Sequence, residues 1–120
     1  MRDPQKLDVV RAAAELAVSV YRSTKDFPRD ERFGLTAQIR RSAISVGSNI
    51  VEGCHRQGNR AFLAFLHQAL GSAAELEFQR RIALELGFAD AHALDAVRDL
   101  ANKVKRMLIN LITSLRTRGN

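Results

Sequence analysis

The stretch ALDAVRDLANKVKRMLINLITSLRT, residues 93–117, decides the fold class of this chain. Its apolar residues recur at alternating steps of three and four over three heptads. They are Leu94, Val97, Ala101, Val104, Leu108, Leu111 and Leu115. Side chains at this spacing share one face of an α-helix, because the helix turns once every 3.6 residues. The pattern therefore predicts an amphipathic helix over about residues 90–117, with Asp90 as its N-cap.

Three further segments show the same periodicity, and no useful length of chain shows the period of two that is typical of a β-strand. They predict helices over about residues 5–25, 30–53 and 59–86. Pro28 disfavours a helical conformation at Phe27 and so ends the first helix. Gly53 or a residue near it is the expected end of the second, and Asn59 is the expected N-cap of the third.

Each predicted helix has one apolar face, and we expect these faces to form a common core. The faces of the first three are Leu7, Val10, Ala14, Ala17, Tyr21 and Thr24; Leu35, Ile39, Ala43, Val46 and Ile50; and Phe62, Leu66, Ala69, Ala73, Leu76 and Ala83. Four helices with short connections pack as an antiparallel, up-and-down four-helix bundle. The sequence thus predicts one all-α domain spanning residues 1–120.

The composition excludes several classes of protein. Hydrophobic residues make up 46% of the 120 residues and only two prolines occur, which argues against disorder. Charges interrupt the long apolar stretches, so no transmembrane helix is expected, and acidic residues near the start argue against a signal peptide. The single cysteine, Cys54, cannot form an internal disulfide, which fits a reducing compartment. We expect a cytoplasmic protein with no membrane partner.

The positive charge points to RNA or DNA as a partner. The formal net charge is +6 and the pI is about 10.4, with the excess concentrated in the second and fourth quarters of the chain. Lysine and arginine that neutralise phosphates release counterions, which favours binding. The candidate phosphate contacts, without base readout, are Arg40, Arg41, Arg56, Arg60, Lys103 and Arg106. The alternative is that these residues serve solubility or salt bridges within the bundle.

Two polar stripes lie beside the apolar faces of the second and third predicted helices. They are Ser42, Ser45, Asn49 and Glu52, and Gln68, Ser72, Glu75 and Gln79, with Gly71 next to them. Small neutral residues let helices approach closely, so we expect the stripes to be partly buried, between these helices or against a second subunit. The candidate network or oligomer interface is Ser45, Asn49, Glu52, Gly53, Gly71, Ser72 and Glu75. Arg40 or Arg41 would pair with Glu52 or Glu75; the alternative is an exposed polar face.

The same residues carry a family resemblance. The segments LTAQIRRSAISVGSNIVEG (residues 35–53) and FLAFLHQALGSAAELE (residues 62–77) resemble the bacterial four-helix-bundle family of 23S rRNA intervening-sequence proteins. The matching positions are Tyr21, Phe27, Pro28, Gln38 to Arg41, Ser45, Ser48 to Ile50, Glu52, Gly53, Phe62, Phe65, Leu66, Gly71, Ser72, Glu75 to Glu77 and the LGF at 86–88. The chain departs from the family in lacking a tryptophan near Val10 and in having Ala61 where an acidic residue is common.

The resemblance implies a non-enzymatic bundle that forms a homopentamer. A distant relative is the accessory protein of diversity-generating retroelements, a basic pentamer that binds nucleic acid and a reverse transcriptase. For this chain the resemblance implies self-association and an accessory or scaffold role with RNA or DNA. The alternative partner is a protein encoded nearby in the genome.

Three enzyme-like patterns also occur. Glu52 and His55 have the E-x-x-H spacing of di-iron bundles, but the second copy that such sites need is absent, so we expect no metal and no cofactor. Cys54 beside His55 lacks a third, orienting group. Arg60 and His67 fit a loose R-x4–6-H pattern found in some all-helical ribonucleases, which leaves metal-independent RNA cleavage as a further alternative to the non-enzymatic function that we expect.

Overall fold

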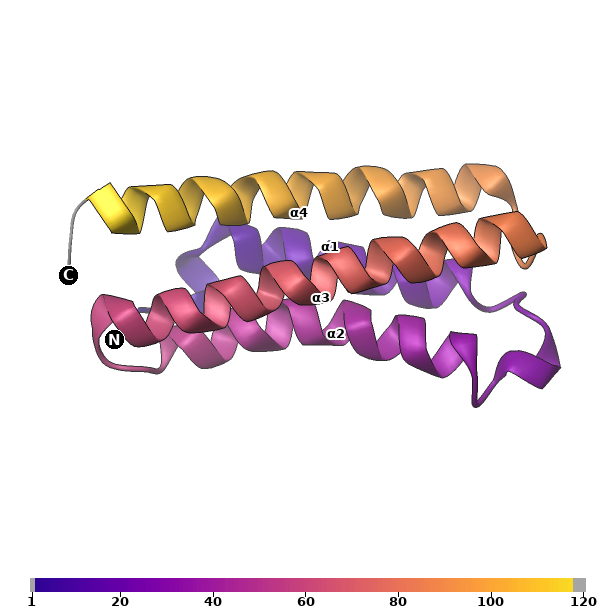
Figure 1. The fold of residues 1–120 in the computed structure, drawn as a ribbon, viewed down its shortest axis with the longest axis horizontal. Helices are drawn as coiled ribbons and strands as arrows, with labels where there is room; N and C mark the ends of the chain where they lie inside the picture. Colours follow the sequence, from indigo (N-terminus) through magenta and orange to yellow (C-terminus); the bar gives the residue numbers. More distant parts are fainter. Residues whose placement is uncertain (1, 118–120) are drawn as a thin grey trace.

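The computed structural model describes residues 2–117, and four α-helices and two short 3-10 helices account for the secondary structure of that part of the chain. The α-helices are α1 (Asp8–Ser23), α2 (Leu35–Cys54), α3 (Gly58–Leu86) and α4 (Ala91–Thr117). The 3-10 helices η1 (Pro4–Lys6) and η2 (Arg29–Glu31) precede α1 and α2. Figure 1 shows the four α-helices lying side by side along the long axis of the molecule. The predicted all-α fold of four helices is confirmed.

Three of the helices begin at other residues than predicted. Residues 4–6 form a separate 3-10 turn, in which the Asp3 carboxylate accepts a hydrogen bond from the Gln5 backbone N–H at 3.0 Å. Helix α2 begins five residues later than expected, where Glu31 Oε1 accepts from the Leu35 N–H at 3.0 Å. Helix α3 begins at Gly58, whose φ is +79°, so the predicted N-cap Asn59 lies inside the helix. These helix starts are set by hydrogen bonds and by glycine in the connecting segments, which lie outside the apolar patterns used for the prediction.

The core is a single cluster to which every α-helix contributes one buried stripe. Its largest fully buried side chains include Phe62, Leu16, Ile39, Ile50 and Leu66. In α4 the predicted stripe is buried from Leu94 to Leu108 and again at Leu115, but Ile112 is buried in place of Leu111, which is only half-buried. The shift follows from the 3.6-residue turn, which drifts away from a strict heptad.

The core face of α1 is only partly the predicted one: Thr24 is buried, and Leu7, Val10 and Ala17 are half-buried against the core. The residues that α1 buries are Val9, Ala12, Ala13, Leu16 and Val20. Of the predicted face, Ala14 is exposed and the Tyr21 side chain is 42% exposed. Helix α1 has two neighbouring apolar stripes, and the one with the larger aliphatic residue Leu16 at its centre faces the core. Part of the second stripe, with Ala14 and Tyr21, is left at the surface.

The two ends of the molecule are closed by different contacts. At the end where α3 turns into α4, Gly87 has a φ of +71°, which favours glycine, and the Phe88 N–H donates to the Ala83 carbonyl at 3.0 Å. There the rings of Phe27 and Phe88 meet edge to face, with centroids 5.7 Å apart. The other end holds the turn from α2 to α3 and the start of the described chain (Figure 1). No helix within residues 2–117 has the length and apolar character needed to cross a membrane.

Candidate functional site

The two predicted polar stripes meet along the seam between α2 and α3. The hydroxyl oxygens of Ser45 and Ser72 lie 2.8 Å apart across the seam. Asn49 Nδ2 donates to the Ser45 carbonyl at 2.9 Å and to Ser45 Oγ at 3.1 Å. Ser42 Oγ donates to Glu75 Oε1 at 3.4 Å. The sequence placed these residues on the sides of their helices that face each other.

The remaining residues of the predicted network lie apart from the seam's hydrogen bonds. Glu52 forms an ion pair with Arg56 at 2.9 Å, and both side chains are about half exposed. Gly53 is buried within α2, and a Cβ there would lie 2.9 Å from Phe62 Cδ1 and from Phe65 Cβ. Its role is therefore close contact with α3, since α2 continues past it to Cys54.

A cleft of about 390 Å³ opens along the seam. It is lined by Gln38, Arg41, Ser42, Ser45, Glu75 and Gln79. Gln79 is only 8% exposed, and its Oε1 atom accepts no hydrogen bond from the described part of the chain. The expected pairing of Arg41 with a carboxylate is not among the ion pairs of residues 2–117. Sequence spacing identified five of these lining residues as polar but could not show the space between them.

Two of the six candidate phosphate-binding side chains are already bonded to other groups of the chain. Arg40 Nε donates to Thr24 Oγ1 at 2.8 Å, and its guanidinium lies 4.6 Å from the centroid of the Tyr21 ring. Arg56 pairs with Glu52. The other four are exposed, and within residues 2–117 none forms a hydrogen bond or an ion pair with a side chain: Arg41, Arg60, Lys103 and Arg106.

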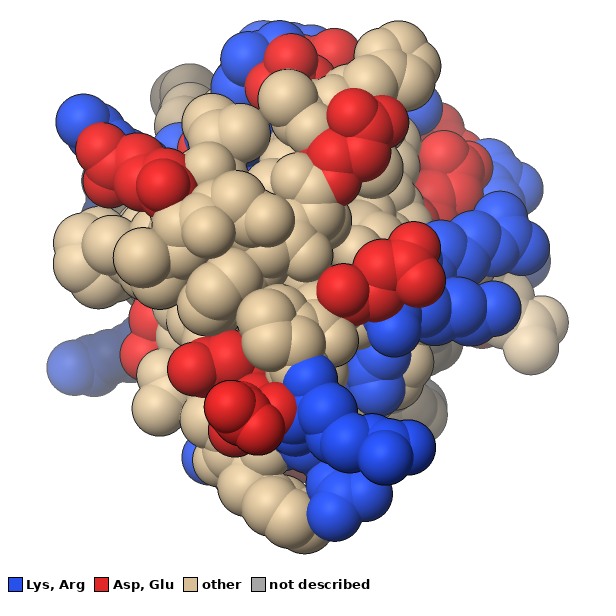
Figure 2. Space-filling model, turned by 90° about the vertical axis from the view of Figure 1, so that its right-hand side faces the viewer, with Lys and Arg blue, Asp and Glu red and all other residues tan. Residues whose placement is uncertain are grey.

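The six candidates do not form one patch on a single chain. Arg40 and Arg41 lie in the first half of α2, and Arg56 and Arg60 lie at the turn into α3. The remaining two lie on α4, which is not a direct neighbour of α2 in the bundle. Figure 2 looks onto the end where α1 leads to α2, and there basic side chains gather on one side while acidic ones cross the middle. The positive charge is thus spread over several places.

Arg2 is a site residue that the sequence did not indicate. Its guanidinium lies 4.1 Å from the centroid of the Phe62 ring and donates a hydrogen bond to Asn59 Oδ1. With His55 and Arg56 it lines a pocket of about 590 Å³ at the α2–α3 turn. A single arginine near the start of the chain belongs to no periodic pattern, so nothing in the sequence marks it.

The residues of the enzyme-like patterns lie as follows within the described part of the chain. Arg60 and His67 are seven residues apart on α3, roughly 10 Å along the helix axis. His67 Nε2 instead lies 3.0 Å from Arg116 Nη2. Cys54 is fully buried while His55 is exposed, and burial raises the pKa of the Cys54 thiol, an effect that nearby Arg2 partly offsets. Within residues 2–117, no three His, Cys, Asp or Glu side chains gather as metal ligands.

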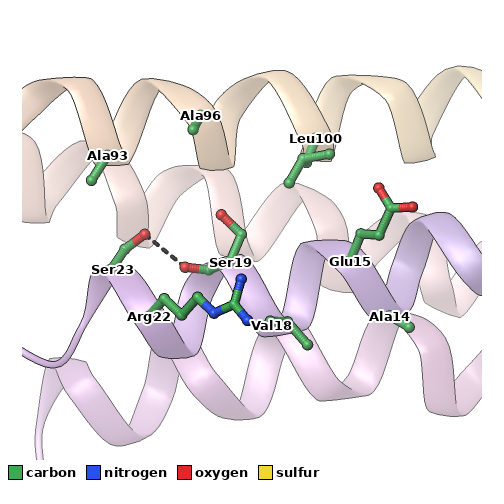
Figure 3. Close-up of a pocket in the computed structure, with 9 residues that line it drawn as sticks. All are labelled: Ala14, Glu15, Val18, Ser19, Arg22, Ser23, Ala93, Ala96 and Leu100. Carbon is green, nitrogen blue, oxygen red and sulfur yellow. Dashed lines mark hydrogen bonds between the residues drawn. The ribbon is translucent and has the colours of Figure 1, made fainter.

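A groove of about 650 Å³ lies between α1 and α4 (Figure 3). Its walls are Ala14, Glu15, Val18, Ser19, Arg22 and Ser23 from α1, and Ala93, Ala96 and Leu100 from α4. In Figure 3, Ser23 Oγ donates to the Ser19 carbonyl at 2.7 Å, which satisfies that hydroxyl within its own helix. The groove is mainly apolar, and of its α1 residues the sequence had assigned Ala14 to the core.

The chain is similar to known proteins in both sequence and fold. Residues 5–110 match the family described as 23S rRNA-intervening sequence protein. The chain is also similar to a crystal structure described as a protein with unknown function from the S23 ribosomal protein family of Bacteroides thetaiotaomicron VPI-5482. That similarity has a TM-score of 0.80 at 25% identity and covers 87% of this chain and 97% of the other. No curated protein sequence matches.

Proposed function

The chain belongs to the 23S rRNA-intervening sequence protein family, and we propose that it is a non-enzymatic, self-associating bundle that binds RNA or DNA as an accessory or scaffold in the cytoplasm. One observation carries the nucleic-acid part of the proposal. Arg41, Arg60, Lys103 and Arg106 are exposed and unpaired within residues 2–117, on a chain of net charge +6. A cation without a carboxylate partner is free to meet a phosphate, and each phosphate contact releases counterions.

Self-association is supported by the surface of α1. Val18 on α1 is 46% exposed, and Ile44 on the neighbouring α2 is 47% exposed. A helix that is apolar on two sides is expected to be covered on both. We propose that a second copy of the chain covers the outer side of α1, in the homopentamer that the family resemblance implies. Short connections such as residues 55–57 favour an antiparallel, up-and-down order within each copy.

Self-association would also compensate for the separation of the basic residues on a single chain. Each copy has three separate places with candidate phosphate contacts, and a ring would repeat each place around its axis. Repeated weak contacts raise the overall affinity for a long polyanion, because the second contact becomes intramolecular. The phosphate contacts and the oligomer are therefore parts of one proposal.

Filter binding of a labelled single-stranded RNA tests the phosphate contacts. The test variant replaces Arg41, Arg60, Lys103 and Arg106 with glutamine. The matched control variant replaces Lys6, Lys25, Arg29 and Arg81, so the two proteins have the same net charge. We expect the test variant to lose at least about tenfold in affinity and the control to lose less. Equal losses would show that net charge, and not these four residues, is responsible.

The groove between α1 and α4 also favours a second candidate, a module that binds a protein encoded nearby in the genome. Light scattering of the purified chain separates the two candidates. A mass several times 13.4 kDa, with five copies expected from the resemblance, supports self-association. A monomer would leave the groove open for another protein and would contradict the oligomer.

A further inference from the structure

Opposite charges line the cleft between α2 and α3 without meeting. Arg41 contributes a guanidinium from α2, and Glu75 contributes a carboxylate from α3. The only hydrogen bond that Glu75 accepts within residues 2–117 is the 3.4 Å contact from Ser42. The cleft of about 390 Å³ lies within the size range of ligand sites, roughly 300–1,000 Å³. The walls thus present a donor and an acceptor with room for a small group between them.

A buried amide adds a third polar group to this cleft. Gln79 lines the cleft, is 8% exposed and has an Oε1 atom without a hydrogen-bond donor in the described chain. Such buried polar atoms are rare in folded proteins, because leaving them unpaired costs free energy. Rotation of the amide turns either its oxygen or its NH2 group toward the cleft. A ligand that pairs with Gln79 would recover the lost hydrogen bond.

The ligand must accept from Arg41 and donate to Glu75 at the same time. A guanine base does both, since O6 and N7 accept from an arginine fork while N1–H and N2–H2 are adjacent donors for the two carboxylate oxygens. Cytosine and adenine offer one exocyclic amino group, and uracil offers none. We propose that this cleft binds a single unstacked guanine, with Arg41, Glu75 and Gln79 as the contacting residues.

An exposed aromatic ring on the same helix as Glu75 suits the same ligand. Phe78 lies one turn along α3 from Glu75 and is 66% exposed. Proteins that bind unstacked bases commonly stack them on exposed aromatic side chains. The net charge of +6 attracts the backbone that carries the base. The inference rests on the proposed function, because it supplies base preference to a surface otherwise expected to contact only phosphates.

Two labelled RNAs of equal length and charge test the inference by fluorescence anisotropy with the full chain. One is an undecamer of uridine, and the other has a single guanosine at its centre. We expect the guanosine RNA to bind about tenfold more tightly, the effect of one good bidentate base contact. Glu75→Gln should remove this difference and leave uridine RNA binding in place. The control Glu85→Gln makes the same charge change at an exposed position of α3 outside the cleft and should keep the difference.

The outcomes separate this inference from the function on which it rests. Equal binding of both RNAs, with strong salt dependence, would overturn the guanine cleft and leave phosphate binding intact. If neither RNA binds, the proposed function fails, and guanosine 5′-monophosphate is compared with uridine 5′-monophosphate by NMR. A shift of the Gln79 side-chain amide with the guanosine nucleotide alone would assign the cleft to free nucleotide. The absence of that shift would overturn the inference.

Discussion

Two glycines, Gly53 in the last turn of α2 and Gly71 in the interior of α3, have opposite surroundings. A Cβ at Gly53 would lie 2.9 Å from atoms of Phe62 and Phe65, whereas a Cβ at Gly71 would meet nothing within 4 Å. Gly53 therefore permits the contact between α2 and α3. Gly71 costs α3 stability without a compensating contact inside the described chain.

The two positions predict opposite effects of the same substitution. Gly53→Ala forces the aromatic rings apart and should lower the free energy of unfolding by about 1–3 kcal/mol. Gly71→Ala lowers the backbone entropy of the unfolded chain, so it should raise the free energy of unfolding by about 0.5–1 kcal/mol. Urea unfolding of both variants measures this. A stable Gly53→Ala protein would contradict the close packing at that point.

The buried thiol of Cys54 predicts a dependence of stability on pH. Burial raises its pKa in the folded chain, while in the unfolded chain the thiol ionises near its ordinary pKa of about 8.5. Between these two pKa values only the unfolded state loses the proton, so the free energy of unfolding should fall as pH rises above about 8. Urea unfolding from pH 7 to 10 should show a steeper fall for the natural chain than for Cys54→Ala. If the free energies of unfolding of the two proteins fell in parallel with pH, the Cys54 thiol would not be the cause of the fall.

At the scale of the elements, the seam between α2 and α3 was the most predictable feature. Serine and asparagine at steps of three and four mark a helix side that carries mostly small neutral residues, with one carboxylate on each helix. Ser45 and Ser72 share a hydrogen bond across the seam at 2.8 Å. Ser72 Oγ has no other hydrogen-bond partner within residues 2–117, so replacing Ser45 strands it, whereas Ser45 Oγ keeps its bond from Asn49 when Ser72 is replaced. Replacing both serines removes the polar pair.

A double-mutant cycle tests this pairing. Ser45→Ala and Ser72→Ala should each lower the free energy of unfolding by about 1 kcal/mol. The double variant should lose less than the sum of the two, since contacting residues couple by about 0.5 kcal/mol or more. If the losses in the free energy of unfolding were additive, the two hydroxyls would not be hydrogen-bonded to each other.

Features that depend on three-dimensional arrangement were not predictable. Periodicity located four helices, but it could not choose between the two apolar stripes of α1, because both have acceptable spacing. It also gave no sign that Arg80 would be buried, at 7% exposure, with its Nε 2.9 Å from Glu77 Oε1. For the candidate site, spacing placed Ser45 and Ser72 on facing sides. The cleft itself and the contacts of Arg2 depend on how neighbouring helices pack.

At the scale of the whole molecule, the exposed stripe of α1 predicts the effect of a charge on assembly. Val18→Glu places a carboxylate on the groove between α1 and α4, and a buried unpaired charge is costly. We expect a lower solution mass by light scattering, with helix content unchanged by circular dichroism. Lys25→Glu, at an exposed position outside the groove, is the control and should keep the mass of the natural chain. An unchanged mass for Val18→Glu would exclude this face as the interface.

The salt dependence of RNA binding tests the central claim most directly. Binding of a labelled single-stranded RNA to the natural chain is measured from 50 to 200 mM salt. Four phosphate contacts on a single strand predict a slope of roughly −2.8 in log affinity against log salt, a loss of about fifty-fold over this range. Absence of binding at 50 mM, or binding that is unchanged at 200 mM, would contradict the account of a basic bundle that holds nucleic acid through its phosphates.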